Sequence, residues 1–144
     1  MVKKANKNDI ETLANLAVIM WSTHSVEDLI NEFSKSLSNG KTQFFLKYEN
    51  DEPVGFAQCQ LRYDYVEGTE TTPVGYLEGI FIKDEYRKKG YAKELLTECE
   101  AWAKLNGCKE FASDCELDNT DSIRFHNAMN FAEVNRIVCF TKKL

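Results

Sequence analysis

Features that mark several other classes of protein are missing from this 144-residue sequence. No apolar run approaches the roughly 20 residues that a membrane-spanning helix requires, so we expect no membrane partner. The opening stretch MVKKANKNDIETL has no apolar segment typical of a secretory signal, so we expect a cytoplasmic protein. Repeats, low-complexity tracts and flexible linkers are also missing. The length suits one domain over residues 1–144.

Cysteine and histidine are too few and too scattered for a disulfide framework or a metal site. The five cysteines are odd in number and include no CxxC pair, so we expect small core residues. Only two histidines occur, and we expect no metal ion. The net charge of −5 argues against nucleic-acid binding and favours a cationic partner. The cysteines are Cys59, Cys99, Cys108, Cys115 and Cys139.

The first half of the sequence predicts a short strand, two helices and a hairpin. Residues 1–5 suit the strand, and apolar residues recur at helical spacing within residues 6–22. Asn6 and Ser25 are candidate N-caps, and Asn39-Gly40 is a candidate end for the second helix. Residues 42–66 then predict two strands joined at ENDEP.

The second half alternates strands with helices. We expect strands in 75–86, 109–116 and 132–143, with helices over 90–107 and 119–131. Strand–helix–strand units favour parallel pairing, whereas the early hairpin favours antiparallel pairing. The sequence therefore predicts an α/β (α+β) fold with a mixed sheet and helices on both faces.

The segment YRKKGYA, residues 86–92, stands between a predicted strand and a predicted helix. A glycine at a helix N-terminus lets an anion approach free backbone amides, and the neighbouring cations add charge. The segment therefore suits a pyrophosphate. An ordinary charged turn is the alternative. Neither a Walker loop nor GxGxxG occurs.

Two motifs resemble the GCN5-related N-acetyltransferase (GNAT) family. Residues 87–92, RKKGYA, match its [RQ]-x-x-G-x-[GA] pattern, and residues 119–131 match N-x-x-A-x-x-x-Y-x-x-x-G-F in part. Ser122, His126 and Asn130 replace the alanine, tyrosine and glycine of the second pattern. The resemblance implies a mostly antiparallel sheet whose fourth and fifth strands splay apart.

The same resemblance implies acetyl-CoA as the co-substrate, held in that opening. Its pantetheine arm would pair with the backbone of the fourth strand, its pyrophosphate would lie on the following turn, and Asn119 would bond the arm. The implied cofactor-binding residues are Ile80, Phe81, Ile82, Arg87, Lys88, Lys89, Gly90, Tyr91, Ala92, Lys93 and Asn119.

A narrower resemblance concerns residues 62–81, residues 110–119 and the stretch MWSTHS. These segments are similar to one subgroup of aminoglycoside 6'-N-acetyltransferases, which acetylate antibiotics and confer resistance. Aminoglycosides are polycations, so carboxylates are needed to hold them. Glu78 interrupts an apolar strand and must be paired or face a cleft. We expect Glu78 and Asp114 to bind the substrate, whereas Glu67 and Glu116 suit solvated loop acids equally well.

Four other residues are substrate-binding candidates on this resemblance. Trp21 and Tyr65 could form flat walls against the sugar rings, although the position of Trp21 alone suits a core residue. His24 suits a substrate contact or a surface position. Asn135 stands where the subgroup has a glutamate, so one substrate-facing charge would be missing.

The chemistry requires a neutral amine to attack the thioester, so a base must remove a proton. We expect Glu78 to do this through water, with Asp114 and His24 as helpers and a backbone N–H near Ile80 or Phe81 for the oxyanion. His126, in the place of the family's tyrosine, is either the acid for the CoA thiolate or a helix residue without a chemical part.

The acceptor could be another small amine, such as a polyamine, or a peptide N-terminus, and the chain could be a CoA-binding module without activity. The resemblance also implies a homodimer, with residues 136–143 at the interface.

Overall fold

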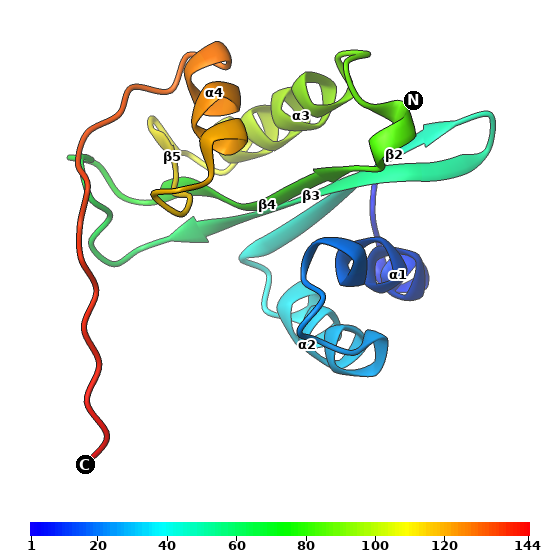
Figure 1. Ribbon diagram of the computed structural model, residues 1–144, viewed down its shortest axis with the longest axis horizontal. Helices are drawn as coiled ribbons and strands as arrows, with labels where there is room; N and C mark the ends of the chain where they lie inside the picture. The colour runs from blue at the N-terminus through cyan, green and yellow to red at the C-terminus, as the bar shows by residue number, and fades with distance from the viewer.

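The computed structural model describes all residues, 1–144, and contains one five-stranded sheet in the order β1-β2-β3-β4-β5. Four α-helices and two short 3-10 helices accompany it (Figure 1). The elements are β1 (Val2–Lys4), η1 (Lys7–Asp9), α1 (Ile10–Met20), α2 (Val26–Ser38), β2 (Thr42–Glu49), β3 (Glu52–Arg62), β4 (Val74–Ile82), η2 (Asp84–Tyr86), α3 (Tyr91–Leu105), β5 (Phe111–Ser113) and α4 (Thr120–Ala128).

Local signals in the sequence set most of these boundaries. Asn6 accepts from the Asn8 amide, and its own amide donates to Asp9 at 2.9 Å, which closes a capping box at η1. Ser25 caps α2 by accepting from the Asp28 amide. Asn50 and Asp51 both have positive φ, which matches the tight turn between β2 and β3.

The mixed sheet and its two helical layers are as expected. Neighbouring strands from β1 to β4 are antiparallel, and β4 and β5 are parallel. In Figure 1, α1 and α2 cover one face of the sheet, and α3 and α4 lie on the other. Phe33, Phe44 and Phe56 are fully buried on the first side, and Leu95 and Cys99 are fully buried on the second.

Two local features of β4 shape the centre of the sheet. Gln58 of β3 faces Gly79, whereas Cys59 faces Leu77, so Glu78 is the extra residue of a β-bulge. On the other side of β4, the ladder with β5 ends at the pair Leu77–Ser113, although β4 continues to Ile82. The expected opening between the fourth and fifth strands therefore begins at this pair.

The strand predicted over 132–143 is wrong. Residues 132–144 contain no regular secondary structure and are exposed throughout. Figure 1 shows this tail running away from the sheet, so the tail finds no ladder partner in its own chain. A strand pattern without a neighbouring strand leaves the backbone to water. The second predicted strand–helix–strand unit is consequently incomplete.

The prediction for the cysteines is correct at three positions and wrong at two. Cys59, Cys99 and Cys108 are buried, whereas Cys115 and Cys139 are exposed, and all five are free thiols. Cys115 and Cys139 are exposed because neither lies in a helix or strand that packs on the core. Cys115 follows β5, and Cys139 lies in the tail. None of the helices combines the length and apolar character needed to cross a membrane.

Candidate active site

The turn before α3 presents a row of free backbone amides. Gly90 is the N-cap of α3 with φ +82°, and no side chain caps the helix. The first helical hydrogen bond runs from the Glu94 amide to the Gly90 carbonyl, and no amide of residues 88–93 donates to a protein acceptor. A Cβ at Gly90 would meet nothing within 4 Å. A hollow of about 350 Å³ beside the turn is lined by Gly90 and Lys93, and farther along α3 by Glu94 and Glu98. This end of α3 can receive an anion.

The cations of this turn do not all point at that position. Arg87 donates to the Ile82 carbonyl at 3.0 Å and pairs with Asp84 at 3.1 Å. Lys89 pairs with Glu49 at 3.3 Å, and the Tyr91 hydroxyl donates to the same carboxylate. The Tyr91 hydrogen bond, followed by Lys89, lowers the pKa of Glu49. The sequence predicted the charges but not this carboxylate, which lies 42 residues from Tyr91 in the chain.

Of the β4 residues assigned to the pantetheine arm, Phe81 and Ile82 are buried in the two cores, and Ile80 is half-buried. Their backbone lies beyond the last β4–β5 pair and has no strand neighbour on that side. Asn119 caps α4, and its Oδ1 accepts from the Ser122 amide at 3.1 Å. The Nδ2 group of Asn119 makes no hydrogen bond within the chain, so a ligand carbonyl can accept from it.

Four polar side chains form a connected network beside β4, on the face of the sheet that α1 and α2 cover. The Arg62 guanidinium donates to the Glu78 carboxylate at 2.8 and 3.2 Å, and it stacks on the Tyr76 ring at 3.4 Å. The Tyr76 hydroxyl donates to Asp114. The predicted pair Glu78 and Asp114 is thus joined through Arg62 and Tyr76, two residues that the sequence did not single out.

The side chain of Glu78 is only 23% exposed, so it is paired and partly open to solvent at once. Burial, with the hydrogen bond to Asp114 as the next contribution, raises the pKa of Tyr76, which keeps its hydroxyl a donor at neutral pH. The alternation of Tyr76 and Glu78 along one strand was the signal in the sequence that could have identified Tyr76 as a neighbour of Glu78. Arg62 lies on the neighbouring strand, so only the register places it there.

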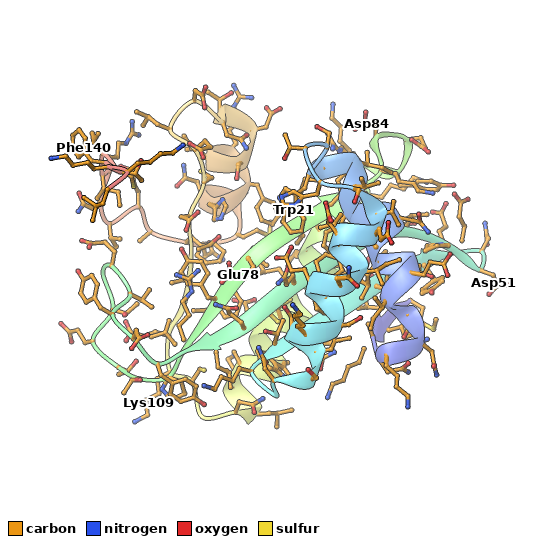
Figure 2. The ribbon with its side chains drawn as sticks, turned by 90° about the horizontal axis from the view of Figure 1, so that it is seen from below. Trp21, Asp51, Glu78, Asp84, Lys109 and Phe140 are labelled. Carbon is orange, nitrogen blue, oxygen red and sulfur yellow. The ribbon has the colours of Figure 1, made fainter.

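Trp21 lies at the end of α1 and contacts both the core and β4. Its ring meets Phe33 and Phe56 edge-on at 6.4 and 5.9 Å, and a Cβ at Gly79 would come within 2.7 Å of the indole. Gly79 is therefore needed for this close approach. Figure 2 shows Trp21 near the part of the sheet that carries Glu78, on the side of α1 and α2. His24 is exposed beyond the helix, and no other side chain bonds to it.

Tyr65 and Asn135 both donate a hydrogen bond to the Glu67 carboxylate. The Tyr65 hydroxyl donates to Glu67 at 2.7 Å, and the Asn135 amide donates to the other carboxylate oxygen at 3.0 Å. These two hydrogen bonds, with that of Tyr65 the larger, lower the pKa of Glu67. Val134 packs on Gly68, where a Cβ would come within 2.6 Å of it. The start of the tail is thus attached to the 63–72 loop.

His126 lies on α4 with both ring nitrogens engaged. Its Nδ1 is 2.7 Å from the Ser122 carbonyl, and its Nε2 is 2.8 Å from the Ser113 hydroxyl. Phe125 and Phe131 flank the ring at centroid distances of 5.6 and 5.1 Å. The sequence did not single out Ser113, because a serine in a short strand carries no signal of its own.

Three comparisons with known proteins agree with this geometry. Residues 8–131 match the family model described as the acetyltransferase (GNAT) family. The chain is 37% identical to an aminoglycoside N(6')-acetyltransferase type 1 of Serratia marcescens over 100% of this chain and 99% of the relative. It is 34% identical to one of Acinetobacter haemolyticus, over 99% and 98% of the two chains.

Solved structures are similar over the whole chain. AAC(6')-Iy, in complex with the bisubstrate analogue CoA-S-monomethyl-acetylneamine, has a TM-score of 0.95 at 30% identity, covering 100% of this chain and 98% of that one. The 6'-N-acetyltransferase AAC(6')-IG of Acinetobacter haemolyticus has a TM-score of 0.94 at 34% identity, covering 100% and 99%. The resemblance and the fold inferred from residues 87–92 and 119–131 are confirmed, and the chain belongs to the acetyltransferase (GNAT) family.

Proposed function

We propose that this chain, an acetyl-CoA-dependent N-acetyltransferase, acetylates the 6'-amine of aminoglycosides and so confers resistance to these antibiotics. The observation that carries the proposal is the arrangement around the β4–β5 opening. A turn of free amides adjoins the far end of β4, and paired carboxylates occupy the sheet face beside the opening. The relatives that match over the full chain bear the same activity in their names.

Acetyl-CoA would bind along the opening and the turn before α3. The amides of residues 88–93 suit its pyrophosphate, with Lys88 and Lys93 as the exposed cations nearest to it. Backbone groups of Ile80 to Ile82 would pair with the pantetheine arm, and Asn119 Nδ2 would donate to an arm carbonyl. Arg87 and Tyr91 act from the side, because they hold the turn through Ile82 and Glu49.

The aminoglycoside would occupy the sheet face on the α1 and α2 side. Glu78 and Asp114 suit its ammonium groups, because charge-assisted hydrogen bonds are the strong ones. Trp21 offers an edge of its indole beside Gly79, the residue after Glu78, and His24 follows Trp21 three residues later in the chain. Glu67, held between Tyr65 and Asn135, supplies a negative charge beside the position where residue 135 lacks one.

In the reaction, Glu78 would take a proton from the ammonium through water, and the neutral nitrogen would attack the thioester carbon. Asp114 assists by holding a second ammonium or the water, while Tyr76 donates to it. A backbone N–H of Ile80 or Phe81 on the open side of β4 would bond the developing oxyanion. Acetyl-CoA and the five free thiols suit a cytoplasmic location.

We also infer a homodimer built by the tail. Its exposed apolar side chains include Ile137, Val138 and Phe140, and exposed apolar side chains of this kind mark an interaction surface. β5 is a three-residue edge strand with no neighbour on its outer side. An unpaired edge is a template for another strand, and the tail of a second copy has the matching strand pattern.

The proposed activity is tested by a thiol-release assay with acetyl-CoA and matched acceptors. Neomycin carries an amine at the 6' position, and paromomycin carries a hydroxyl there instead. We expect turnover with neomycin, kanamycin and tobramycin and none above background with paromomycin. Faster turnover with spermidine or a peptide N-terminus would favour another amine as the substrate. Acetyl-CoA binding without turnover on any amine would favour a binding module.

A further inference from the structure

Ser113 occupies the point at which β4 and β5 part. It is the last residue of β5 to pair with β4, opposite Leu77. Its neighbour Asp114 faces Tyr76 on one side of the sheet, and the Ser113 side chain faces α4 on the other. Alternation along the strand therefore places a hydroxyl and a carboxylate on opposite sides of one opening. Ser113 is half-buried, so it keeps some exposure at the point where the two strands part.

The hydrogen bonds of His126 determine what the Ser113 hydroxyl does. A carbonyl oxygen only accepts, so Nδ1, 2.7 Å from the Ser122 carbonyl, carries a hydrogen. In a neutral ring Nε2 is then an acceptor, and the Ser113 hydroxyl, at 2.8 Å, donates to it. In a protonated ring Nε2 donates to the Ser113 oxygen, and the serine hydrogen then points to the Leu77 carbonyl, 3.3 Å away, or to a ligand acceptor in its place. Phe125 and Phe131 keep the ring in this orientation.

These contacts leave His126 no free nitrogen with which to protonate a leaving group itself. We infer that the Ser113 hydroxyl is the catalytic group that contacts the departing sulfur of coenzyme A. His126 is the residue that positions this hydroxyl and returns a proton to it. The inference rests on the proposed placement of acetyl-CoA in the opening. It divides the chemistry between the last residue of β5 and the residue that follows it, with the amine on the Asp114 side and the sulfur on the Ser113 side.

The C–S bond of the tetrahedral intermediate breaks, and its electron pair goes to sulfur. Sulfur takes the hydrogen of Ser113, while the Nε2–H of protonated His126 passes to the serine oxygen. Ser113 is then intact, His126 is neutral with Nδ1–H still on the Ser122 carbonyl, and coenzyme A leaves as the thiol. His126 regains a proton from water, which has received the one released by the attacking amine.

The test measures single-turnover acetyl transfer, with enzyme in excess over acetyl-CoA, for wild type, four single variants and one double variant. Ser113→Ala should slow transfer on the order of 100-fold while the calorimetric Kd for acetyl-CoA stays within about twofold. Ser113→Thr keeps the hydroxyl and should recover most of the rate. Ser34→Ala, on the exposed side of α2, is the serine control and should match wild type.

His126→Phe keeps the aromatic packing and removes both nitrogens. It should slow transfer in the wild-type background and add little to Ser113→Ala, because the two residues act as one unit. A merely structural role would instead change acetyl-CoA affinity or give additive losses. A Ser113→Ala rate within about twofold of wild type would overturn the inference.

Failure of the proposed function is distinguishable, because wild type itself would then not acetylate neomycin. Hydrolysis of acetyl-CoA by the same variants, without any amine, expels the same thiolate and tests Ser113 independently. A loss in the Ser113→Ala variant supports the inference there too, and an unchanged hydrolysis rate contradicts it.

Discussion

Glu78 combines a bulge, a cationic partner and partial exposure. The bulge inserts it into β4 opposite the step from Gln58 to Cys59, which directs its carboxylate toward Arg62 instead of a core. An ion pair with Arg62 holds the carboxylate in one orientation at a position that is 23% exposed. A carboxylate held in this way can act as a base through water and can also hold an ammonium.

We predict that Glu78→Gln lowers turnover with neomycin by about 100-fold, because the amide cannot take the proton. The amide is isosteric, so the calorimetric Kd for acetyl-CoA should stay within about twofold. Glu70→Gln, an exposed change in the neighbouring loop, is the control and should leave turnover unchanged. Turnover of Glu78→Gln equal to that of the control would remove Glu78 from the chemistry.

At the scale of the element, the first turns of α3 and of η1 show two uses of a helix start. Gly90 leaves the α3 amides open, whereas Asn6 and Asp9 close the amides of η1 with side chains. The difference lies in the residues themselves, because glycine has no side chain to accept a hydrogen bond and adopts positive φ without strain. An uncapped start is available to a ligand, and a capped start stabilises the fold.

For α3 we predict that Gly90→Asp weakens acetyl-CoA binding by about tenfold or more relative to Gly90→Asn, because only aspartate repels the diphosphate. Both side chains tolerate positive φ similarly, so backbone strain is matched. Isothermal calorimetry measures the two Kd values, and saturating acetyl-CoA should restore most of the turnover. Equal Kd values for the two variants would place the diphosphate elsewhere.

For η1 we predict that Asp9→Asn lowers the free energy of unfolding by about 1 kcal/mol at pH 7. Burial opposes the charge of Asp9, but Lys3 at 2.7 Å and the Asn6 amide outweigh it, so the pKa of Asp9 is lowered. A lowered pKa stabilises the fold above the ordinary aspartate value of about 3.9 and loses this effect as pH falls through the folded value.

The difference between wild type and Asp9→Asn in urea unfolding should therefore be largest above about pH 5 and shrink toward pH 2. Glu11→Gln, an exposed change one residue into α1, is the control and should give no such pH dependence. A difference that stays constant down to pH 2 would contradict an ionic contribution from Asp9.

At the scale of the whole molecule, the sheet separates two layers with different tasks. Figure 1 shows α1 and α2 on one face of the sheet and α3 and α4 on the other. The first face carries Glu78 and the edge of Trp21, with Asp114 bonded to Tyr76, and the second carries Ser113 bonded to His126 of α4. The tail, residues 132–144, has no helix or strand and is exposed throughout. Figure 2 shows Phe140, a residue of the tail, at one end of the molecule and away from both cores.

We predict that deletion of residues 136–144 converts a dimer into a monomer in light scattering after gel filtration. Phe140→Asp should weaken the dimer, because it places a charge in the proposed interface. Thr141→Asp adds the same charge on the opposite face of an extended tail and should have the smaller effect. A wild-type mass equal to that of one chain at all concentrations would contradict the dimer.

The sequence alone determined the elements whose signals are local. The caps at Asn6 and Ser25, the turn at Asn50-Asp51 and Gly90 at the start of α3 depend on residues a few positions apart, so each could be inferred correctly. The motifs over 87–92 and 119–131 identified the family for the same reason. Glu78 could be singled out because a carboxylate within an apolar strand is costly unless it is paired or faces a cleft.

Only the tertiary structure decided the partners. Arg62 and Tyr76 join Glu78 to Asp114, Ser113 meets His126, and Glu49 holds Tyr91, because strand register and helix packing bring together residues far apart in the chain. The strand predicted over 132–143 failed on the same ground. A strand pattern specifies which side chains alternate, but a strand forms only where a second strand supplies hydrogen-bond partners, and this chain places none beside its tail.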